Sequence, residues 1–396
     1  MNLRSFRIMK GVSFMILLLV FSLTLSASLL DVYKSGKIKL VPDPNFGKGT
    51  DWDIYFPQGI KDIAFAKDGS FFATGFGNKA QHCVYKFDKN GKFLKKIGRK
   101  GRGPGDLYHP GALSILDNKY LLVADYPLNM KISVFDLNGK FIKIIKTRDP
   151  VFDVVGLGNN KIAILTFRFE KAGAIEYSTI YFEDIKTEKK SVIKIYKNLR
   201  KKLKSQGGVI MIPIFTKQVY LYKFNDKSIL CGFSGIPRID IFSFNGNLIK
   251  SFKLKVYKEK PENNEKKSFY KYLADIYKKN PYAIKILKRM YKNNTLFPED
   301  KPYYSSLYLD NEGNVLVFGN IKYLYNEKKK ELYIANKVKI DIWTKELKYV
   351  GKMVIDPESR EGEILSKEKL WFNNGYIYYF DDEGGILKRV EIEKNQ

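Results

Sequence analysis

One strand–turn–strand segment recurs along the chain and constrains its fold more than any other feature. Its clearest copy is VYKFDKNGKFLKKIG from Val84, in which Asn90-Gly91 supplies the positive-φ residues that a tight hairpin needs. Clear copies also begin at Ile132, Ile239 and Ile340, and weaker ones at Ser178 and Ile386. The matching aromatic or apolar positions lie 48, 47, 60, 101 and 47 residues apart. Six such all-β units predict a six-bladed β-propeller, because one unit cannot bury its own faces.

Each copy is preceded by further apolar runs that would complete a four-stranded blade. In the first unit these runs are Ile60–Phe65 and Ser70–Thr74, and the turn residues at their ends favour strands over helices. The last unit has only three strands of its own: Lys369–Phe372, Tyr376–Phe380 and Leu387–Ile392. We therefore expect the N-terminal strand Lys37–Val41 to complete the last blade and close the ring, which would leave no free sheet edge there.

The interval of 101 residues is about twice as long as the others. Its extra length predicts a helical hairpin inserted between blades four and five, at about residues 259–296. Phe269, Tyr272, Leu273 and Ile276 follow the spacing of one helix face, and Asn280-Pro281 is typical of a second helix start. From residue 253 to 292 there are thirteen basic and four acidic residues, a net charge of +9. The insertion is interpreted as a lid on one propeller face or, alternatively, as part of a ligand cleft.

A glycine-rich connector follows the first repeat. Its glycines favour a sharp turn close to a neighbouring backbone, and its N–H groups and basic side chains offer, as the alternative, a site for an anion. No Gly-Lys-Ser/Thr follows, so it is not a nucleotide-binding P-loop. The candidate ligand-binding residues are Arg99, Lys100, Arg102 and His109. The residues assigned a structural role are Gly98, Gly101, Gly103, Pro104, Gly105 and Pro110, together with Asp125 further along.

This connector and the segment VADYPLNMKISVFDLNGKF from Val123 resemble the motifs of NHL-repeat and TolB-like six-bladed propellers. The likeness is good over residues 60–145 and poor over 150–215. The helical insertion before the Phe297-Pro298 return is similar to that of secreted bacterial relatives of this group. The resemblance implies the fold and leaves the chemistry open, because the fold hosts lyases, lactonases, ligand sensors and scaffolds.

The formal net charge of +28 has two explanations. The chain holds 59 Lys and 11 Arg, and its abundant Lys, Asn, Ile, Tyr and Phe are residues that AT-rich codons encode. The alternative is a real attraction for anionic glycans, lipid headgroups or nucleic acid. Nucleic acid is the least favoured partner, because its readers cluster arginine and here arginine is scattered. Cys83 and Cys231 fall on opposite blades, too far apart for a disulfide.

Residues 1–28 have the pattern of a cleaved export signal, with a basic start, the apolar run Val12–Leu25 and small residues at Ser26-Ala27-Ser28. We expect a secreted or periplasmic propeller over residues 29–396, as a monomer. No cysteine follows the apolar run, so a lipid anchor is not expected. Contact with a membrane is expected only if the signal stays uncleaved.

The sequence offers no catalytic residue, no metal-ligand set and no cofactor motif. Its two histidines, His82 and His109, cannot form a three-histidine zinc site, and neither lies in a nucleophile-elbow context. The leading hypothesis is a non-catalytic binding or scaffold module for an anionic glycan or a protein partner. The alternative is a carboxylate–metal enzyme, a lactonase-like hydrolase or a lyase. Three or four Asp, Glu or Asn side chains on the axis would favour the enzyme, and an apolar or Lys-lined axis the binding module.

Overall fold

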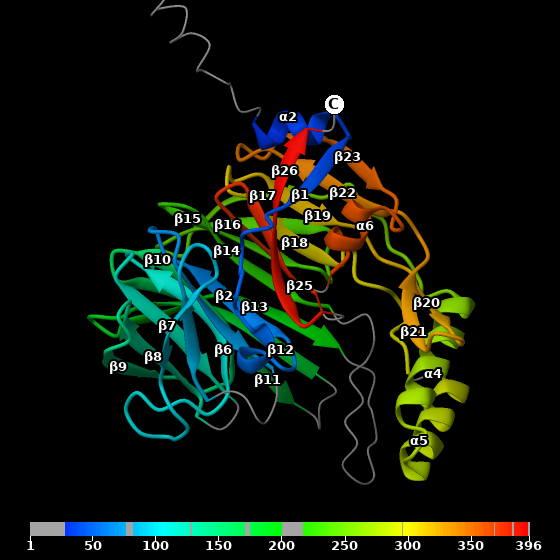
Figure 1. Cartoon of the computed structure of the whole chain (residues 1–396), viewed down its shortest axis with the longest axis horizontal. Helices are drawn as coiled ribbons and strands as arrows, with labels where there is room; N and C mark the ends of the chain where they lie inside the picture. The colour runs from blue at the N-terminus through cyan, green and yellow to red at the C-terminus, as the bar shows by residue number, and fades with distance from the viewer. Residues whose placement is uncertain are drawn as a thin grey trace, which may run out of the picture.

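The computed structural model describes residues 28–76, 82–126, 129–170, 175–199, 217–294, 296–367, 369–381 and 384–394. Within these ranges, six four-stranded antiparallel sheets follow one another along the chain (Figure 1). The first strands of successive blades pack against one another, as they do around a propeller axis. The predicted six-bladed all-β fold is confirmed. The predicted export signal, apart from Ser28, lies outside the described residues.

The blades are short meanders whose strands run from the axis outward. Blade one is β2 (Ile60–Phe65), β3 (Phe71–Gly75), β4 (Val84–Phe87) and β5 (Phe93–Ile97), and blade two is β6 (Pro110–Leu116), β7 (Tyr120–Asp125), β8 (Lys131–Asp136) and β9 (Phe141–Lys146). Blade three is β10 (Val151–Gly158), β11 (Lys161–Glu170), β12 (Ile175–Asp184) and β13 (Lys190–Leu199), and blade four is β14 (Val219–Asn225), β15 (Ser228–Phe233), β16 (Arg238–Ser243) and β17 (Leu248–Lys253). Blade five is β18 (Ser306–Leu309), β19 (Val315–Phe318), β22 (Val338–Trp343) and β23 (Tyr349–Ile355).

Blade six joins the two ends of the chain. Its strands are β24 (Leu370–Asn373), β25 (Tyr376–Asp381), β26 (Ile386–Lys394) and the N-terminal β1 (Ile38–Pro42), which is the outermost strand. β1 pairs antiparallel with β26, with Leu40 opposite Ile392. Leu40 is almost fully buried, in one apolar cluster with side chains of blades five and six. The strand lies one residue further along the chain than the expected Lys37–Val41.

Adjacent blades share apolar clusters, and close backbone contact occurs where a glycine permits it. A Cβ on Gly156 of β10 would lie 2.3 Å from the carbonyl oxygen of Ile115 in β6, so only glycine fits at this meeting of blades two and three. Asp88, at the turn of the first repeat, accepts hydrogen bonds from the N–H groups of Asn90 and Lys92. The same pattern holds at Asp136 and Asp310, so these carboxylates stabilise turns.

The extra length of the fifth unit contains two insertions. α4 (Asn263–Ile276) and α5 (Pro281–Lys292) lie between blades four and five, and the side chain of Asn280 caps α5. The hairpin β20 (Tyr323–Asn326) and β21 (Glu331–Ile334), which the sequence analysis missed, lies inside blade five and packs on α4. Figure 1 shows the four elements together at the edge of the molecule. Their shared core contains Phe269, Ile286, Leu287, Leu296, Phe297, Tyr323 and Leu332.

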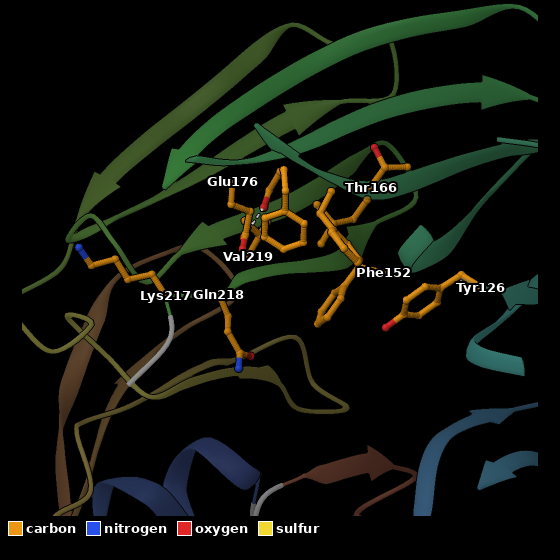
Figure 2. A pocket seen from close by; sticks show the side chains of 11 residues that line it. Tyr126, Phe152, Thr166, Glu176, Lys217, Gln218 and Val219 are labelled. Atoms are coloured by element: carbon orange, nitrogen blue, oxygen red, sulfur yellow. Dashed lines mark hydrogen bonds between the residues drawn. The ribbon is translucent and has the colours of Figure 1, made fainter. Parts of the chain in front are cut away.

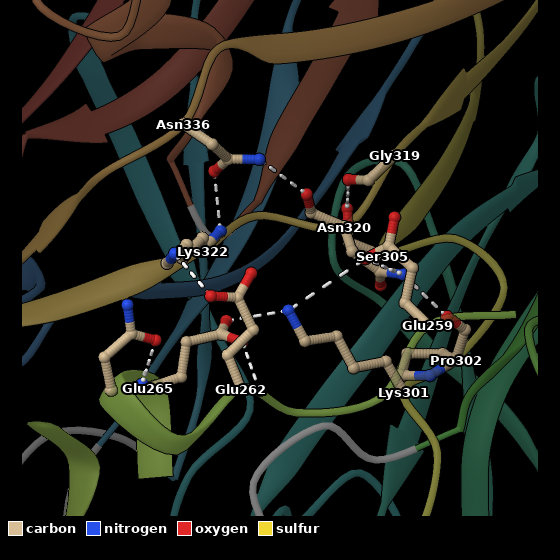
Figure 3. A network of polar contacts seen from close by, with 11 residues as sticks. Glu259, Glu262, Glu265, Lys301, Pro302, Ser305, Gly319, Asn320, Lys322 and Asn336 are labelled. Atoms are coloured by element: carbon tan, nitrogen blue, oxygen red, sulfur yellow. Dashed lines mark hydrogen bonds and ion pairs between the residues drawn. The ribbon is translucent and has the colours of Figure 1, made fainter. Parts of the chain in front are cut away.

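A buried ion pair fastens this insertion to the propeller (Figure 3). Lys301, just before blade five, donates from Nζ to Oε1 of Glu265 in α4 at 2.7 Å, and the two side chains are 4% and 0% exposed. The second oxygen of Glu265 accepts from the N–H of Glu262, which starts α4 with a capping box. Glu262 in turn accepts from Lys322, beside the β20–β21 hairpin.

Short helices flank the sheets. α2 (Leu29–Lys34) precedes β1, α3 (Trp52–Tyr55) lies before blade one, and α6 (Arg360–Leu365) lies before blade six. The segment before blade one thus contains a helical turn, and its Trp52 is buried against Phe46 and Phe87. Among the described helices, none is both long enough and apolar enough to span a bilayer.

Candidate functional site

The strand order defines one face of the propeller, here called the connector face. In an antiparallel four-stranded blade, the loop between the second and third strands lies on the same side as the connection to the next blade. The glycine-rich connector, the helical insertion and the β20–β21 hairpin are all such connections. The chain also enters each blade on this face, so the first residues of the innermost strands lie on it as well.

Backbone N–H groups of the glycine-rich connector form hydrogen bonds within the connector, one of them to the carboxylate of Asp106. The N–H of Gly101 donates to the carbonyl of Leu107 at 3.1 Å, and the N–H of Gly103 donates to Oδ2 of Asp106 at 3.2 Å. A Cβ on Gly101 would lie 2.3 Å from the same Asp106 oxygen, which explains the glycine there. These two N–H groups therefore have partners within the loop.

The three basic residues of the connector have different surroundings. Arg99, with an 85% exposed side chain, pairs with Asp106 at 2.9 Å. This hydrogen bond is the main influence that lowers the pKa of Asp106, with a smaller contribution from the N–H of Gly103. Lys100 lies 5.8 Å from the ring centre of Tyr108, and Arg102 is exposed.

Asp125 anchors the connector to blade two. Its buried carboxylate accepts from the N–H groups of Tyr108 and His109, at 2.9 and 2.6 Å, and from the amide of Asn129. Lys131, 4% exposed, donates to the carbonyls of Gly103 and Asp106. Pro110 begins β6 opposite Asp125. These contacts fix the direction in which the chain enters the second blade.

The structure brings the two histidines together beside this anchor. The ring centres of His82 and His109 are 6.2 Å apart, and Nδ1 of His82 is 2.5 Å from the carbonyl oxygen of Tyr108. Burial lowers the pKa of His109, and the positive charges of His82 and Lys61 lower it further, while Asp125 acts in the opposite direction. Of the four candidate ligand-binding residues, His109 is the one whose ring lies beside the second histidine.

β-Bulges occur at equivalent places in the innermost strands of blades one and three. In β2 the register shifts between Ile60 and Asp62, and in β10 it shifts between Val151 and Asp153. Each innermost strand thus has an extra residue, Lys61 or Phe152, followed by an aspartate. Bulges of this kind often redirect side chains near binding sites.

Asp62 joins three blades around the channel. Its Oδ1 accepts from Nζ of Lys369 at 2.7 Å and from Nε1 of Trp371 at 3.1 Å, both in blade six. Its Oδ2 accepts from the N–H of Leu113 in blade two at 2.8 Å. Both carboxylate oxygens are therefore used to hold the ring together.

Asp153 projects from blade three and interacts electrostatically with Lys369 of blade six. Burial raises the pKa of its carboxyl to about 7, the charge of Asp62 raises it as well, and Lys369 opposes both. Its Oδ1 accepts from the N–H of Val154 at 2.8 Å. Burial raises the pKa of Tyr222 in blade four. The negative charges of Asp153 and Asp62 contribute to the same increase.

This group of side chains from different blades thus contains two carboxylates, a lysine and a tyrosine. Across the described ranges, no three His, Cys, Asp or Glu side chains are grouped closely enough to hold a metal ion. The side chain of Lys369 keeps 46% of its surface exposed because it lines the channel.

A pocket of about 210 Å³ lies between blades two, three and four (Figure 2). Four of the side chains that line it are aromatic, and the others include both apolar and polar groups. The lining residues are Tyr126, Phe152, Leu165, Thr166, Phe167, Phe169, Glu176, Ser178, Lys217, Gln218 and Val219. Several of them lie where β7 and β11 end and β10 and β14 begin, which is the connector face.

The rings in this pocket pack edge to face and remain open to solvent. Phe167 lies 5.8 Å from Tyr126, 6.2 Å from Phe152 and 5.4 Å from Phe169, between ring centres. Phe152 and Phe169 are 49% and 46% exposed. Lys61 holds its Nζ 5.3 Å from the ring centre of Tyr126, which connects the pocket to the mouth of the channel.

The sequence analysis missed this pocket and the channel side chains. The positions of Phe152 and Lys61 depend on β-bulges. A bulge shifts the strand register by one residue, and no marker in the local sequence predicts it. The alternation of Phe167 and Phe169 near the end of β11 was the one usable signal, because it puts two rings on the same side of a strand.

Comparisons with known proteins agree on the architecture. A family model described as 6-bladed beta-propeller matches residues 58–356. No curated protein matches the sequence. Among solved structures, a Bacteroides fragilis protein named as exported is 11% identical, covers 91% of this chain and 95% of its own, and has a TM-score of 0.51. At this identity the likeness shows the fold alone.

Two further solved structures are similar at lower scores. A DUF4221 family member from Bacteroides vulgatus is 12% identical over 90% of this chain and 98% of its own, with a TM-score of 0.48. BamB from Moraxella catarrhalis is 9% identical over 90% of this chain and 99% of its own, with a TM-score of 0.40. The narrower likeness to NHL-repeat propellers stays a prediction.

Proposed function

Because this chain belongs to the 6-bladed beta-propeller family, whose fold hosts unrelated activities, we propose its function from the pocket: an exported, non-catalytic module that binds an anionic glycan. The observation that carries the proposal is the group of half-exposed rings on the connector face. Phe152 and Phe169 each leave almost half of their surface in water, in a concave site. Exposed apolar groups gathered in a pocket are typical of ligand sites.

The chemistry of the pocket suits a sugar. The C–H faces of a pyranose ring can pack on the faces of Phe152 and Tyr126, while its hydroxyl groups meet Thr166, Gln218 and Ser178. Lys217 at the rim adds a cation. A few polar groups around an apolar wall fix the orientation of a ligand, and the cation favours an acidic one.

Export is the second part of the proposal. The sequence carries a basic, apolar and small-residue pattern over residues 1–28, and one structural neighbour is named as an exported protein. A propeller outside the cytoplasm would meet the acidic polysaccharides of cell surfaces. We propose that the mature protein acts there as a monomer.

A protein partner on the same face is the second candidate. The insertion projects beside the connector face on a buried anchor, and a rigid projection of this kind suits recognition of a protein surface. The carboxylate–metal enzyme is less favoured, since Asp62 already uses both of its oxygens on the protein.

Binding to immobilised acidic and neutral oligosaccharides tests the proposal. We expect the purified protein to bind acidic oligosaccharides, and Phe152→Ala to weaken this binding at least about tenfold, the loss expected for an aromatic anchor. Tyr257→Ala, which alters a ring that is 86% exposed and outside the pocket, should bind as the wild type does. Equal losses in both variants, or no binding to any oligosaccharide, would overturn the glycan proposal.

A further inference from the structure

We propose that Lys61 and His109 form an anion-binding subsite at the mouth of the central channel, and that it takes a carboxylate of the glycan held in the neighbouring aromatic pocket. The inference rests on the proposed function for the identity of the ligand. The subsite itself rests on separate observations, which concern the partners of Lys61 and the position of the histidines.

Lys61 is a half-buried cation without an anionic partner. Within the described part of the chain, its ammonium forms no hydrogen bond or ion pair, and it lies 5.3 Å from the ring centre of Tyr126. Nζ lies beside Gly111, where a Cβ would come within 3.0 Å of it, so the glycine leaves room for this ammonium. Burial also lowers the pKa of Lys61, in keeping with a cation that lacks full compensation.

The acids nearest to Lys61 are committed to other groups. Asp62 bonds to Lys369, Trp371 and the N–H of Leu113. Asp125 bonds to the N–H groups of Tyr108 and His109 and to Asn129. These carboxylates reduce the local positive potential, but neither is in ion-pair contact with Lys61.

His109 supplies the second group of the subsite. Nζ of Lys61 lies beside Gly111, two residues after His109, and the charge of Lys61 contributes to the lowered pKa of His109. His82 lies on its other side, 6.2 Å away between ring centres. The groups facing the pair are therefore His82, Lys369, Asp62 and Asp125. An ammonium with an adjacent imidazole binds a carboxylate through charge-assisted hydrogen bonds, which are stronger than neutral ones.

Tyr126 connects the subsite to the pocket. One edge of the pocket is its ring, and Lys61 lies over that same ring. A sugar packed on Tyr126 and Phe152 would carry an equatorial carboxylate toward Lys61. The structure thus assigns the pocket to acidic sugars in which a carboxylate projects from the edge of the ring.

The test uses the fact that the chain has only two histidines. The pKa of each imidazole in the full-length protein is measured by NMR in sodium glucuronate and in sodium chloride of equal ionic strength, with His82→Gln to assign the signals. We expect glucuronate to raise the pKa of His109 by about half a unit or more relative to chloride, because a bound anion stabilises the imidazolium.

Two lysine variants make the test specific. Lys61→Gln should raise the pKa of His109 in chloride and abolish the response to glucuronate. Lys119→Gln is the matched control, since Lys119 lies 5.2 Å from the ring centre of Tyr120 in a turn on the opposite face, and it should behave as the wild type does. The subsite would be overturned if the pKa of His109 were the same in glucuronate and in chloride. It would also be overturned if glucuronate still raised this pKa in Lys61→Gln.

A titration with oligogalacturonate and its carboxyl-reduced form separates the two proposals. Tighter binding of the acidic form, lost in Lys61→Gln, supports both. Equal binding of both forms supports the pocket and overturns the subsite. A response of His109 to glucuronate without binding of either oligosaccharide supports the subsite and overturns the glycan function.

Discussion

Ionisable side chains buried in this propeller differ in how their charge is compensated. Glu265 and Lys301 form a nearly inaccessible pair, and both oxygens of Glu265 have partners. Asp62 is held by three donors. Asp153 accepts a hydrogen bond from the N–H of Val154, and the negative charge of Asp62 opposes its ionisation. The first two are therefore stabilising parts of the fold, whereas ionisation of Asp153 costs free energy.

Replacement of Lys301 tests the role of the buried pair. Lys301→Met leaves the carboxylate of Glu265 buried without its cation, and we expect a loss of about 3–5 kcal/mol in the free energy of unfolding. Denaturation by urea measures it. Lys329→Met, which breaks a pair with Glu331 whose side chains are 71% and 48% exposed, serves as control and should change little. The interpretation is wrong if both variants lose the same amount.

The raised pKa of Asp153 predicts a pH-dependent stability. Between its unfolded pKa of 3.8 and its folded pKa of about 7, the folded protein binds more protons at this site than the unfolded chain. This contribution to stability is therefore lost as the pH rises through that window. Asp153→Asn should be more stable than the wild type at pH 8 by about 2 kcal/mol, allowing for screening by channel water, and should lose this advantage at pH 4. Thermal unfolding at both pH values measures the difference, and an advantage independent of pH would contradict the assignment.

At the scale of elements, the pattern of turns was more informative than the pattern of strands. The turn of the first repeat needs a positive φ at Gly91, and the strands Ile60–Phe65 and Ser70–Thr74 of the same blade were predicted to within one residue. The β20–β21 hairpin escaped prediction because its strands are only four residues long and its turn, Glu327 to Lys330, is a run of charges. Its stability comes from packing on α4, which is a tertiary contact.

The candidate site was less predictable than the fold. His109 was identified because histidine is rare in this chain, but its neighbours Lys61 and His82 come from other strands and loops. The basic side chains at Arg99, Lys100 and Arg102 were selected for their charge, and in the structure Arg99 pairs with Asp106 while Lys100 lies near the ring of Tyr108. Convergence of side chains across blades depends on bulges and on the ring geometry, neither of which local sequence specifies.

The closing strand provides the test at this scale. Leu40→Asp puts a charge into the apolar cluster of blades five and six, and we expect it to destabilise the protein by more than about 3 kcal/mol because the charge has no partner there. Lys39→Ala, next to it on β1 but with a 57% exposed side chain, should have almost no effect. Unfolding by guanidinium measures both. A tolerated Leu40→Asp would show that β1 is dispensable for ring closure.

For the whole molecule, the two faces of the ring have different roles. The face opposite the connector face consists of short turns in which Asp and Asn side chains bind backbone N–H groups, as Asp68 and Asp117 do. The connector face has the long connections, the insertion, the aromatic pocket and the two histidines. The net charge of +28 describes the whole chain, whereas the proposed selectivity for acidic sugars depends on Lys217 and Lys61.

Hydrogen exchange with and without a bound acidic oligosaccharide is the most direct test of the central claim that this propeller binds its ligand on the connector face. We predict slower exchange at the starts of β10 and β14 and at the end of β11, which surround the pocket, and no change in the turns around Asp68 and Asp117. Protection confined to those opposite turns, or to the outer strands of the blades, would contradict the account.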